Sequence, residues 1–351
     1  MQQTSEKLSS GDDVSVLHGH EAHRALEHLW ARLIAISRAR TVTSVTEAEW
    51  VSEQVLLSGL GLALEETMQF VLRKQPGFDE FERWVLERSQ NLRGSDRLSR
   101  LDAALSGAPY DESVRASITA IDAMDDVLNA DDLAHWAEHG YVVLRNAIPG
   151  EQCEATIASV LRYIGATLDD PTSWYRFPDQ RGVMVQLFHD AAMQANRESP
   201  RIHKAFAQLW GTADLWVTTD RAGFNPPETA EYTFAGPNLH WDMSLVPPIA
   251  FGTQGVLYLT DTEADQGAFT CLPGLHRTLE TWLATLAPDA DPRGAELEGV
   301  RGIPVAAGAG DMVIWHQALP HGGSPNRGTS PRIVQYINMF PTKFEYQTEW
   351  R

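Results

Sequence analysis

The sequence contains few of the residues on which several common classes of protein depend. Its 351 residues include only two cysteines, Cys153 and Cys271, and neither belongs to a CxxC or CxxxC pair. This excludes the disulfide framework of a small secreted domain and a cysteine zinc site, and we expect a reducing, cytoplasmic location. No run of about 18 apolar residues occurs, and the first thirty residues contain no apolar signal-peptide core. We therefore expect neither export nor a membrane span.

Positive charge is also scarce. Lysine and arginine total 28 against 47 aspartate and glutamate residues, which gives a formal net charge of -19. Such a field repels phosphate backbones and anionic lipids, so neither nucleic acid nor a membrane is an expected partner. A Gly-X-Ser-X-Gly nucleophile elbow is missing, and Gly59-Leu60-Gly61 lacks the third glycine of a nucleotide loop. The expected partner is a small-molecule substrate, and the sequence leaves the oligomeric state open.

The first hundred residues have helical periodicity and no strand signal. Apolar residues recur three and four apart from Glu21 onward, and Thr46 with Glu49 forms a capping-box pair ahead of a second helix. The stretch from Gly94 to Asp126 is richer in Ser, Asp, Gly and Arg, which indicates a linker or a loosely helical joint. We predict a helical N-terminal domain of unknown role at 1–107, a linker at 108–126 and a second domain at 127–345.

Histidines are concentrated near the N-terminus, at positions His18, His20, His23 and His28. His20 and His23 could share a helix face, but no cysteine or nearby set of partners completes a tetrahedral metal site. Solvated histidines are therefore the favoured interpretation.

The residue pattern changes from helical periodicity to short strand-like runs beyond residue 126. Short runs of β-branched and aromatic residues, such as Tyr141–Leu144, Gly255–Leu259 and Met312–Trp315, are separated by Pro, Gly, Asn and Asp. Many short strands with turns between them are typical of a β-sandwich or jelly roll. The whole chain is therefore expected to be an α+β protein.

A metal-binding pattern lies in the segment Asn238–Asp242. Side chains alternate between the two faces of an extended segment, so His240 and Asp242 are expected to share one face. A histidine from a distant strand would complete two imidazole nitrogens and one carboxylate oxygen on one face of an octahedron, the arrangement of non-haem Fe(II) oxygenases. The sequence offers His316 and His321 for this third position.

An arginine separates the two candidates. Each histidine is followed eleven positions later by an arginine, Arg327 or Arg332, and a guanidinium can hold a carboxylate through two parallel hydrogen bonds. Arg332 begins an alternating apolar run that predicts a strand, whereas Arg327 lies in a predicted turn. We choose His321 with Arg332 and interpret His316 as a satisfied strand histidine; His276 is likewise interpreted as structural.

With these residues in place, the chain resembles the phytanoyl-CoA dioxygenase (PhyH) family of Fe(II)/2-oxoglutarate oxygenases over roughly Asp131 to Pro341. The family's signatures occur in order: L-A-H-W-A-E-H-G-Y-V-V-L from Leu133, H-W-D from His240, G-A-F-T-C-L-P-G-L-H from Gly267, G-D-M-V-I-W-H from Gly310 and H-G-G-S-P-N from His321. The resemblance implies a double-stranded β-helix (jelly-roll, cupin-like) core.

The resemblance also implies residue roles. His240, Asp242 and His321 would be the catalytic iron ligands, and Arg332 would bind the distal carboxylate of 2-oxoglutarate. Further contacts to this co-substrate would come from Asn238, Tyr258 and Thr270, while Gly323 stands where the family often has a hydroxyl.

The implied enzyme is an Fe(II)/2-oxoglutarate-dependent dioxygenase that uses O2 and releases succinate. It would hydroxylate or desaturate a small-molecule metabolite, because relatives that halogenate have a small residue in place of the Asp242 carboxylate. Segments that could cover the site contain Tyr175, Arg176, Arg181, Gln186, His189 and Arg221, whose arginines would suit an anionic substrate. The alternative is a catalytically silent jelly-roll binding protein that acts through its helical N-terminal domain.

Overall fold

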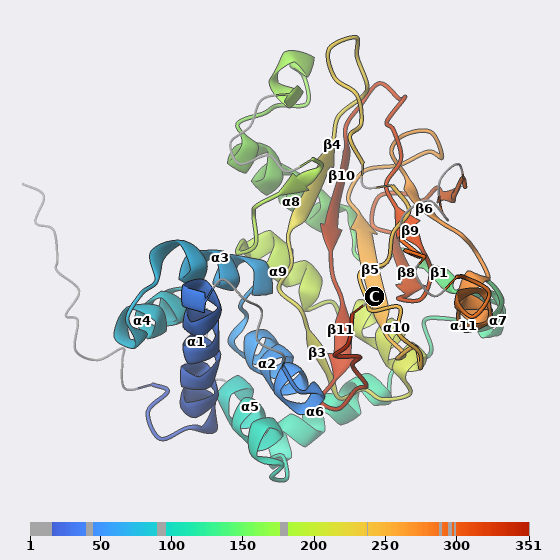
Figure 1. The fold of residues 1–351 in the computed structure, drawn as a ribbon. Helices are drawn as coiled ribbons and strands as arrows, with labels where there is room; N and C mark the ends of the chain where they lie inside the picture. Colours follow the sequence, from blue (N-terminus) through green and yellow to red (C-terminus); the bar gives the residue numbers. More distant parts are fainter. Residues whose placement is uncertain are drawn as a thin grey trace, which may run out of the picture. The chain divides into compact units, whose positions relative to one another are not determined.

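The structure is a computed structural model that describes residues 16–39, 45–89, 96–175, 182–236, 238–287, 290–293, 297 and 300–350. The chain divides into two compact units, Met1–Ser117 and Ile118–Arg351. Among the described residues, the first unit is helical and the second contains the strands (Figure 1).

The helical unit confirms the periodicity predicted for the first hundred residues. Its helices are α1 (Glu21–Ala39), α2 (Glu47–Leu60), α3 (Leu64–Lys74), α4 (Phe78–Arg88), α5 (Asp96–Ser106) and α6 (Glu112–Asp122), which crosses the boundary between the units. The stretch interpreted as a linker or loosely helical joint thus contains two regular helices, and α5 buries Leu98 and Leu101 on one face. Within the described residues no single helix is long and apolar enough to cross a membrane; α2 and α3 reach that length and composition only as a pair bent by 98°.

Sequence signals set both ends of α2. Thr46 and Glu49 form the predicted capping box, in which each side chain accepts a hydrogen bond from the other residue's backbone N–H. Gly61 ends the helix with φ 70°, in the left-handed region, so the single second helix predicted after the capping box is divided into α2 and α3. Gly59 lies inside α2, where a Cβ would stand 2.5 Å from the Leu101 side chain. This glycine therefore allows α5 to approach α2 closely.

The second unit consists of short strands with helices between them. The helices are α7 (Ala130–His139), α8 (Gly150–Ile164), α9 (Ala191–Arg197), α10 (Pro200–Trp210) and α11 (Leu279–Leu283), with 3₁₀ turns at Pro171–Tyr175 and Leu275–Arg277. The strands are β1 (Tyr141–Leu144), β2 (Met184–Val185), β3 (Leu215–Val217), β4 (Ala222–Asn225), β5 (Thr253–Tyr258), β6 (Phe269–Cys271), β7 (Ile303–Val305), β8 (Met312–His316), β9 (His321–Gly322), β10 (Arg332–Tyr336) and β11 (Met339–Pro341). The three runs predicted as strands are confirmed: Tyr141–Leu144 is β1, Gly255–Leu259 overlaps β5, and Met312–Trp315 lies within β8.

The strands form antiparallel sheets. A six-stranded sheet has the order β1-β8-β5-β10-β4-β2, a three-stranded sheet has the order β7-β6-β9, and β11 pairs with β3. Neighbours in the large sheet are far apart in the sequence, as in a double-stranded β-helix. The predicted fold class is confirmed.

The period-two alternation of the strands divides the large sheet into two apolar faces. Leu257, Ile314 and Ile333 belong to the cluster that also contains buried residues of α8, α9 and α10, and Figure 1 shows these helices beside the sheet. The next residues along each strand point the other way: Tyr258 and Trp315 pack with β6 and β7 of the small sheet. The second face is therefore the interior of the β-sandwich.

Candidate metal centre

A β-bridge brings two of the predicted ligands together. His240 and His321 exchange both backbone hydrogen bonds, each with an N···O distance of 2.9 Å, and their ring centroids are 4.7 Å apart. His321 begins β9, which pairs with β6 of the small sheet. The segment around His240 was interpreted as a strand, but the bridge at His240 is its only ladder contact among the described residues.

The predicted alternation of side chains around His240 nevertheless holds. Trp241 is buried, with Leu245, Leu279 and Ala318, and its Nε1 donates to the carbonyl of Ala318 at 2.9 Å. The His240 and Asp242 side chains are partly exposed and face each other instead. The intervening tryptophan therefore anchors the segment while its neighbours stay available to a ligand.

Asp242 lies between the two imidazoles. Its Oδ1 is 3.4 Å from His240 Nε2, and its Oδ2 is 3.3 Å from His321 Nε2. One donor atom from each of the three side chains lies within 4.8 Å of the others, so the group could hold a metal ion. Two imidazole nitrogens and one carboxylate oxygen form the donor set that suits non-haem iron.

Backbone carbonyls fix the orientation of both imidazoles. His240 Nδ1 lies 2.7 Å from the carbonyl oxygen of Asn238, and His321 Nδ1 lies 3.1 Å from that of Leu319. A carbonyl oxygen can only accept, so each Nδ1 must carry the hydrogen. Each Nε2, on the Asp242 side of its ring, is then the nitrogen whose lone pair a neutral ring offers to a metal, while a protonated ring donates from Nε2 to Asp242.

The Asp242 carboxylate and the His240 imidazole shift each other's pKa values. Burial would lower the pKa of His240, but the hydrogen bond and charge of Asp242 outweigh burial and raise it above its usual value. Burial would likewise raise the pKa of Asp242, but the His240 and His321 imidazoles beside it hold this pKa well below its usual range. The carboxylate is therefore ionised at neutral pH, as a metal ligand must be.

A second layer of side chains holds Asp242, and sequence reasoning missed it. Gln254 Nε2 donates to Asp242 Oδ2 at 2.7 Å, and Trp315 Nε1 donates to Gln254 Oε1 at 3.1 Å. Arg293 donates to the carbonyls of Trp241 and Met243, on either side of Asp242. Gln254 is two residues from Val256 and four from Tyr258, so it lies on the same face of β5 as these interior residues. This parity is the signal by which the sequence could have placed Gln254 in the sandwich interior.

Arg332 lies on the same interior face as Val334 of β10, and it is 4% exposed. Its guanidinium carbon is 5.4 Å from the centre of the Tyr258 ring, and its Nε has no hydrogen-bond partner. Burial raises the pKa of Tyr336, and the adjacent Arg332 charge opposes this rise. Within the described part of the chain no carboxylate pairs with Arg332, so a buried cation lacks a counter-ion.

Packing contacts connect Arg332 to the metal-binding group. Arg332 stands over Tyr258, whose hydroxyl accepts from the backbone N–H of Phe269 at 2.8 Å. The Phe269 ring in turn stacks on His321, with centroids 6.0 Å apart and an interplanar angle of 21°. Arg332 and His321 are thus connected through two aromatic residues of the sandwich interior, Tyr258 and Phe269.

The other predicted co-substrate contacts have partners within the protein. The Tyr258 hydroxyl donates to the carbonyl of Val305 at 3.0 Å, and the Thr270 hydroxyl is 3.2 Å from the carbonyl of Gly322. The backbone carbonyl of Asn238 holds His240, while the Asn238 residue itself is exposed. A Cβ on Gly323 would meet the Phe234 ring at 2.8 Å, so this aromatic side chain fills the space beside the position where the family often has a hydroxyl.

His316 lies outside the group of possible metal ligands. It alternates with Trp315 on β8 and so points to the other side of the sheet, where its ring lies 5.3 Å from that of His276. Its Nδ1 accepts a hydrogen bond from the Ala318 N–H at 3.0 Å. Burial, assisted by the nearby His276, lowers the pKa of His316 to about 4. It is a neutral packing residue at neutral pH.

The residues predicted to cover the site are only partly described, because Arg176 and Arg181 lie outside the described residues. The Tyr175 hydroxyl donates to the carbonyl of Pro227 at 3.1 Å, and the Arg221 guanidinium lies over the Phe188 ring and pairs with Asp220. Their role toward substrate stays a prediction.

The donor atoms fit the cofactors that the sequence implied. Two oriented Nε2 atoms and an ionised carboxylate fit a divalent iron, and the buried Arg332 without a counter-ion fits the carboxylate of a co-substrate such as 2-oxoglutarate. Arg332 contacts the Tyr258 ring and His321 stacks on the Phe269 ring, and both rings belong to the sandwich interior. A metal-chelating acid held at one end by an arginine matches this arrangement.

Comparison with known proteins agrees with this chemistry. The family model described as phytanoyl-CoA dioxygenase (PhyH) matches residues 136–334. A Dictyostelium discoideum protein, provisionally named a phytanoyl-CoA dioxygenase, is 23% identical over 260 residues, which cover 59% of this chain and 74% of that protein.

Among solved structures, AviO1 from Streptomyces viridochromogenes Tue57 is 18% identical with a TM-score of 0.45, covering 63% of this chain and 99% of AviO1. EvdO2 from Micromonospora carbonacea var. aurantiaca, solved with 2-oxoglutarate, is 17% identical with a TM-score of 0.45, covering 65% of this chain and 97% of EvdO2. The match over residues 136–334, rather than these distant structures, carries the family assignment.

Proposed function

The chain belongs to the phytanoyl-CoA dioxygenase (PhyH) family of 2-oxoglutarate-dependent non-haem iron oxygenases, and we propose that it hydroxylates, or desaturates, a small-molecule metabolite. When bound, iron and 2-oxoglutarate supply the oxidation of a C–H bond by O2, with decarboxylation of 2-oxoglutarate to succinate and CO2. The observation that carries the proposal is the convergence of His240, Asp242 and His321 on one point with their Nε2 and carboxylate atoms available. We propose the cytoplasm as its location.

In this proposal the side chains of the site have distinct tasks. His240, Asp242 and His321 would hold the metal through two imidazole nitrogens and one carboxylate oxygen, a donor set that leaves positions for co-substrate, substrate and O2. Arg332 orients 2-oxoglutarate by its distal carboxylate through charge-assisted hydrogen bonds. Asn238, Tyr258 and Thr270 are proposed as further contacts to 2-oxoglutarate, and the bonds of the Tyr258 and Thr270 hydroxyls to the carbonyls of Val305 and Gly322 support a role of these two in positioning.

Asp242 also bears on the reaction outcome. Its carboxylate would serve as a metal ligand where relatives that halogenate have a small residue, so the proposed products are a hydroxylated or a desaturated substrate. Hydroxylation leaves one atom of O2 in the product alcohol and the other in succinate. Product mass spectrometry under labelled O2 with excess chloride tests this assignment, because a chlorinated product would contradict it.

The experiment that tests the function is anaerobic addition of Fe(II) and then 2-oxoglutarate to the metal-free chain. We expect the visible charge-transfer band of chelated iron to appear with one iron per chain. His240→Ala, Asp242→Ala and His321→Ala should each lose the iron, whereas His316→Ala is the matched control and should retain it. Undiminished iron in His321→Ala would contradict the assignment of His321 and favour His316, whereas absence of the band in the unaltered chain would favour the silent binding protein.

A further inference from the structure

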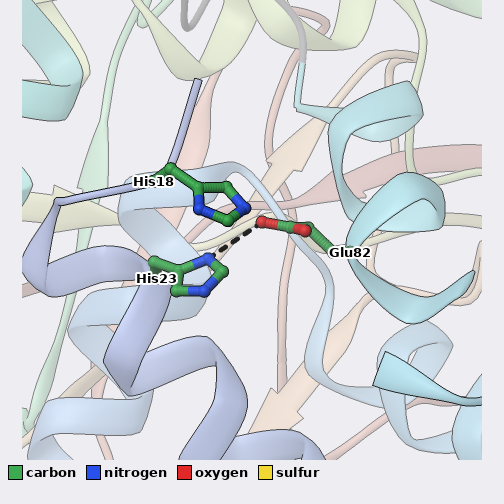
Figure 2. Close-up of side chains that lie close together, drawn as sticks. All are labelled: His18, His23 and Glu82. Carbon is green, nitrogen blue, oxygen red and sulfur yellow. Dashed lines mark hydrogen bonds and ion pairs between the residues drawn. The ribbon is translucent and has the colours of Figure 1, made fainter. Parts of the chain in front are cut away.

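A second group of possible metal ligands lies in the helical unit. It consists of His18, His23 and Glu82, whose donor atoms lie within 4.8 Å of one another. Figure 2 shows both imidazoles directed toward the Glu82 carboxylate. The sequence favoured solvated histidines because no partner was near them in the chain. The structure supplies that partner from α4, 59 residues beyond His23.

The backbone that carries His18 is held in place. His18 lies in a turn that precedes α1, where the His20 N–H donates to the Leu17 carbonyl at 3.0 Å and Leu17 is fully buried. The His20 side chain pairs with Asp102 of α5. The turn is thus anchored on both sides of His18, and its imidazole lies 4.6 Å from that of His23 between ring centroids.

Glu82 provides an independent reason to expect a cation. The residue is 1% exposed, and within the described residues its one partner is His23 Nδ1 at 2.9 Å. No lysine or arginine of the described chain forms an ion pair with it. Withdrawing a carboxylate from water is costly unless a cation or several donors replace the water, and a single imidazole replaces little of it.

We propose that His18, His23 and Glu82 bind a zinc ion that ties the N-terminal turn and α1 to α4. Two imidazole nitrogens and one carboxylate oxygen are an established zinc donor set, and the exposed position of His18 leaves room for water as the fourth ligand. The ion would replace the shared hydrogen of the His23–Glu82 contact and balance the buried charge. The site is separate from the iron site and serves the stability of the helical unit.

The test uses the full-length chain carrying His240→Ala and His321→Ala, so that the iron site no longer competes for zinc. Equilibrium dialysis against Zn(II) should then show one zinc per chain, and zinc should raise the unfolding temperature of the helical unit. Adding His18→Ala should weaken zinc binding at least tenfold and remove the rise. Adding His28→Ala is the matched control, because His28 is an exposed histidine of α1 outside this group.

His18→Ala is the deciding variant because His18 is exposed, so its replacement leaves the core of the unit intact. Glu82→Gln, which keeps the shape of the buried side chain, should weaken zinc binding similarly, with circular dichroism used to confirm the fold. Zinc binding that is unchanged in His18→Ala would overturn the proposal, since the ion would then be held elsewhere. Absence of zinc from the parent protein would overturn it equally.

Discussion

Replacing Arg332 separates co-substrate binding from metal binding. Arg332 is 4% exposed, its Nε is unpartnered, and no described carboxylate neutralises it, so a bound 2-oxoglutarate carboxylate would meet a desolvated guanidinium. Removing one partner of such a charge-assisted contact costs about 2 to 5 kcal/mol. Arg332→Ala should therefore weaken 2-oxoglutarate binding by roughly 30-fold to several thousand-fold. Arg332→Lys should lie between, because it keeps the charge but loses the two parallel hydrogen bonds.

The assay is an anaerobic titration of 2-oxoglutarate into the Fe(II)-loaded protein, followed by the visible charge-transfer band. Iron affinity is measured separately and should change little in Arg332→Ala, because Arg332 is not among the metal-binding group. Arg327→Ala is the matched control, since the Arg327 side chain is 71% exposed and its ion pair with Glu228 is long, with an N···O distance of 4.0 Å. Unchanged 2-oxoglutarate affinity in Arg332→Ala, or a large loss in Arg327→Ala, would refute the assignment.

Further predictions concern the support of the site, its pH dependence and the helical unit. Gln254→Ala should lower iron affinity by about 10- to 100-fold, measured by metal competition, because Asp242 loses an orienting hydrogen bond. The pKa of His316 is lowered from 6.5 to about 4, so the unfolded chain takes up this proton first as the pH falls. The free energy of unfolding should decrease by up to about 3 kcal/mol between pH 6.5 and 4, and urea unfolding of His316→Gln should show a smaller decrease. Deleting residues 1–107 should leave iron and 2-oxoglutarate binding intact in a soluble, folded product; loss of both would contradict the proposed domain boundaries.

The central residues of the site were predictable because they obey short-range rules. His240 and Asp242 are two positions apart, and the alternation of an extended segment puts them on one face whether or not a full ladder forms. The choice between His316 and His321 was also accessible, since Arg332, eleven residues after His321, begins the alternating run that forms β10. Capping and periodicity likewise predicted the helical stretches that form α1 to α4.

The remaining features depend on contacts between distant segments. Glu82 meets His23 from another helix, and no local pattern around Glu82 distinguishes it from a solvated acid. The helix α5 was hidden because its polar sequence resembles a linker, although Gly59 leaves a space on α2 that receives Leu101. Gln254 has no motif of its own, and its role follows only when β5 is placed beside Asp242.

The bridge between His240 and His321 has a consequence for folding order. The chain between these residues forms β5, β6, β7 and β8, which contribute to both sheets. The two imidazoles meet only after those strands have paired, because loop closure over such a separation is unfavourable until the intervening strands supply contacts. A partly folded chain therefore has no metal site of this kind. Iron acquisition is a late event that reports a completed sandwich, and the ion cannot act as the nucleus around which the chain folds.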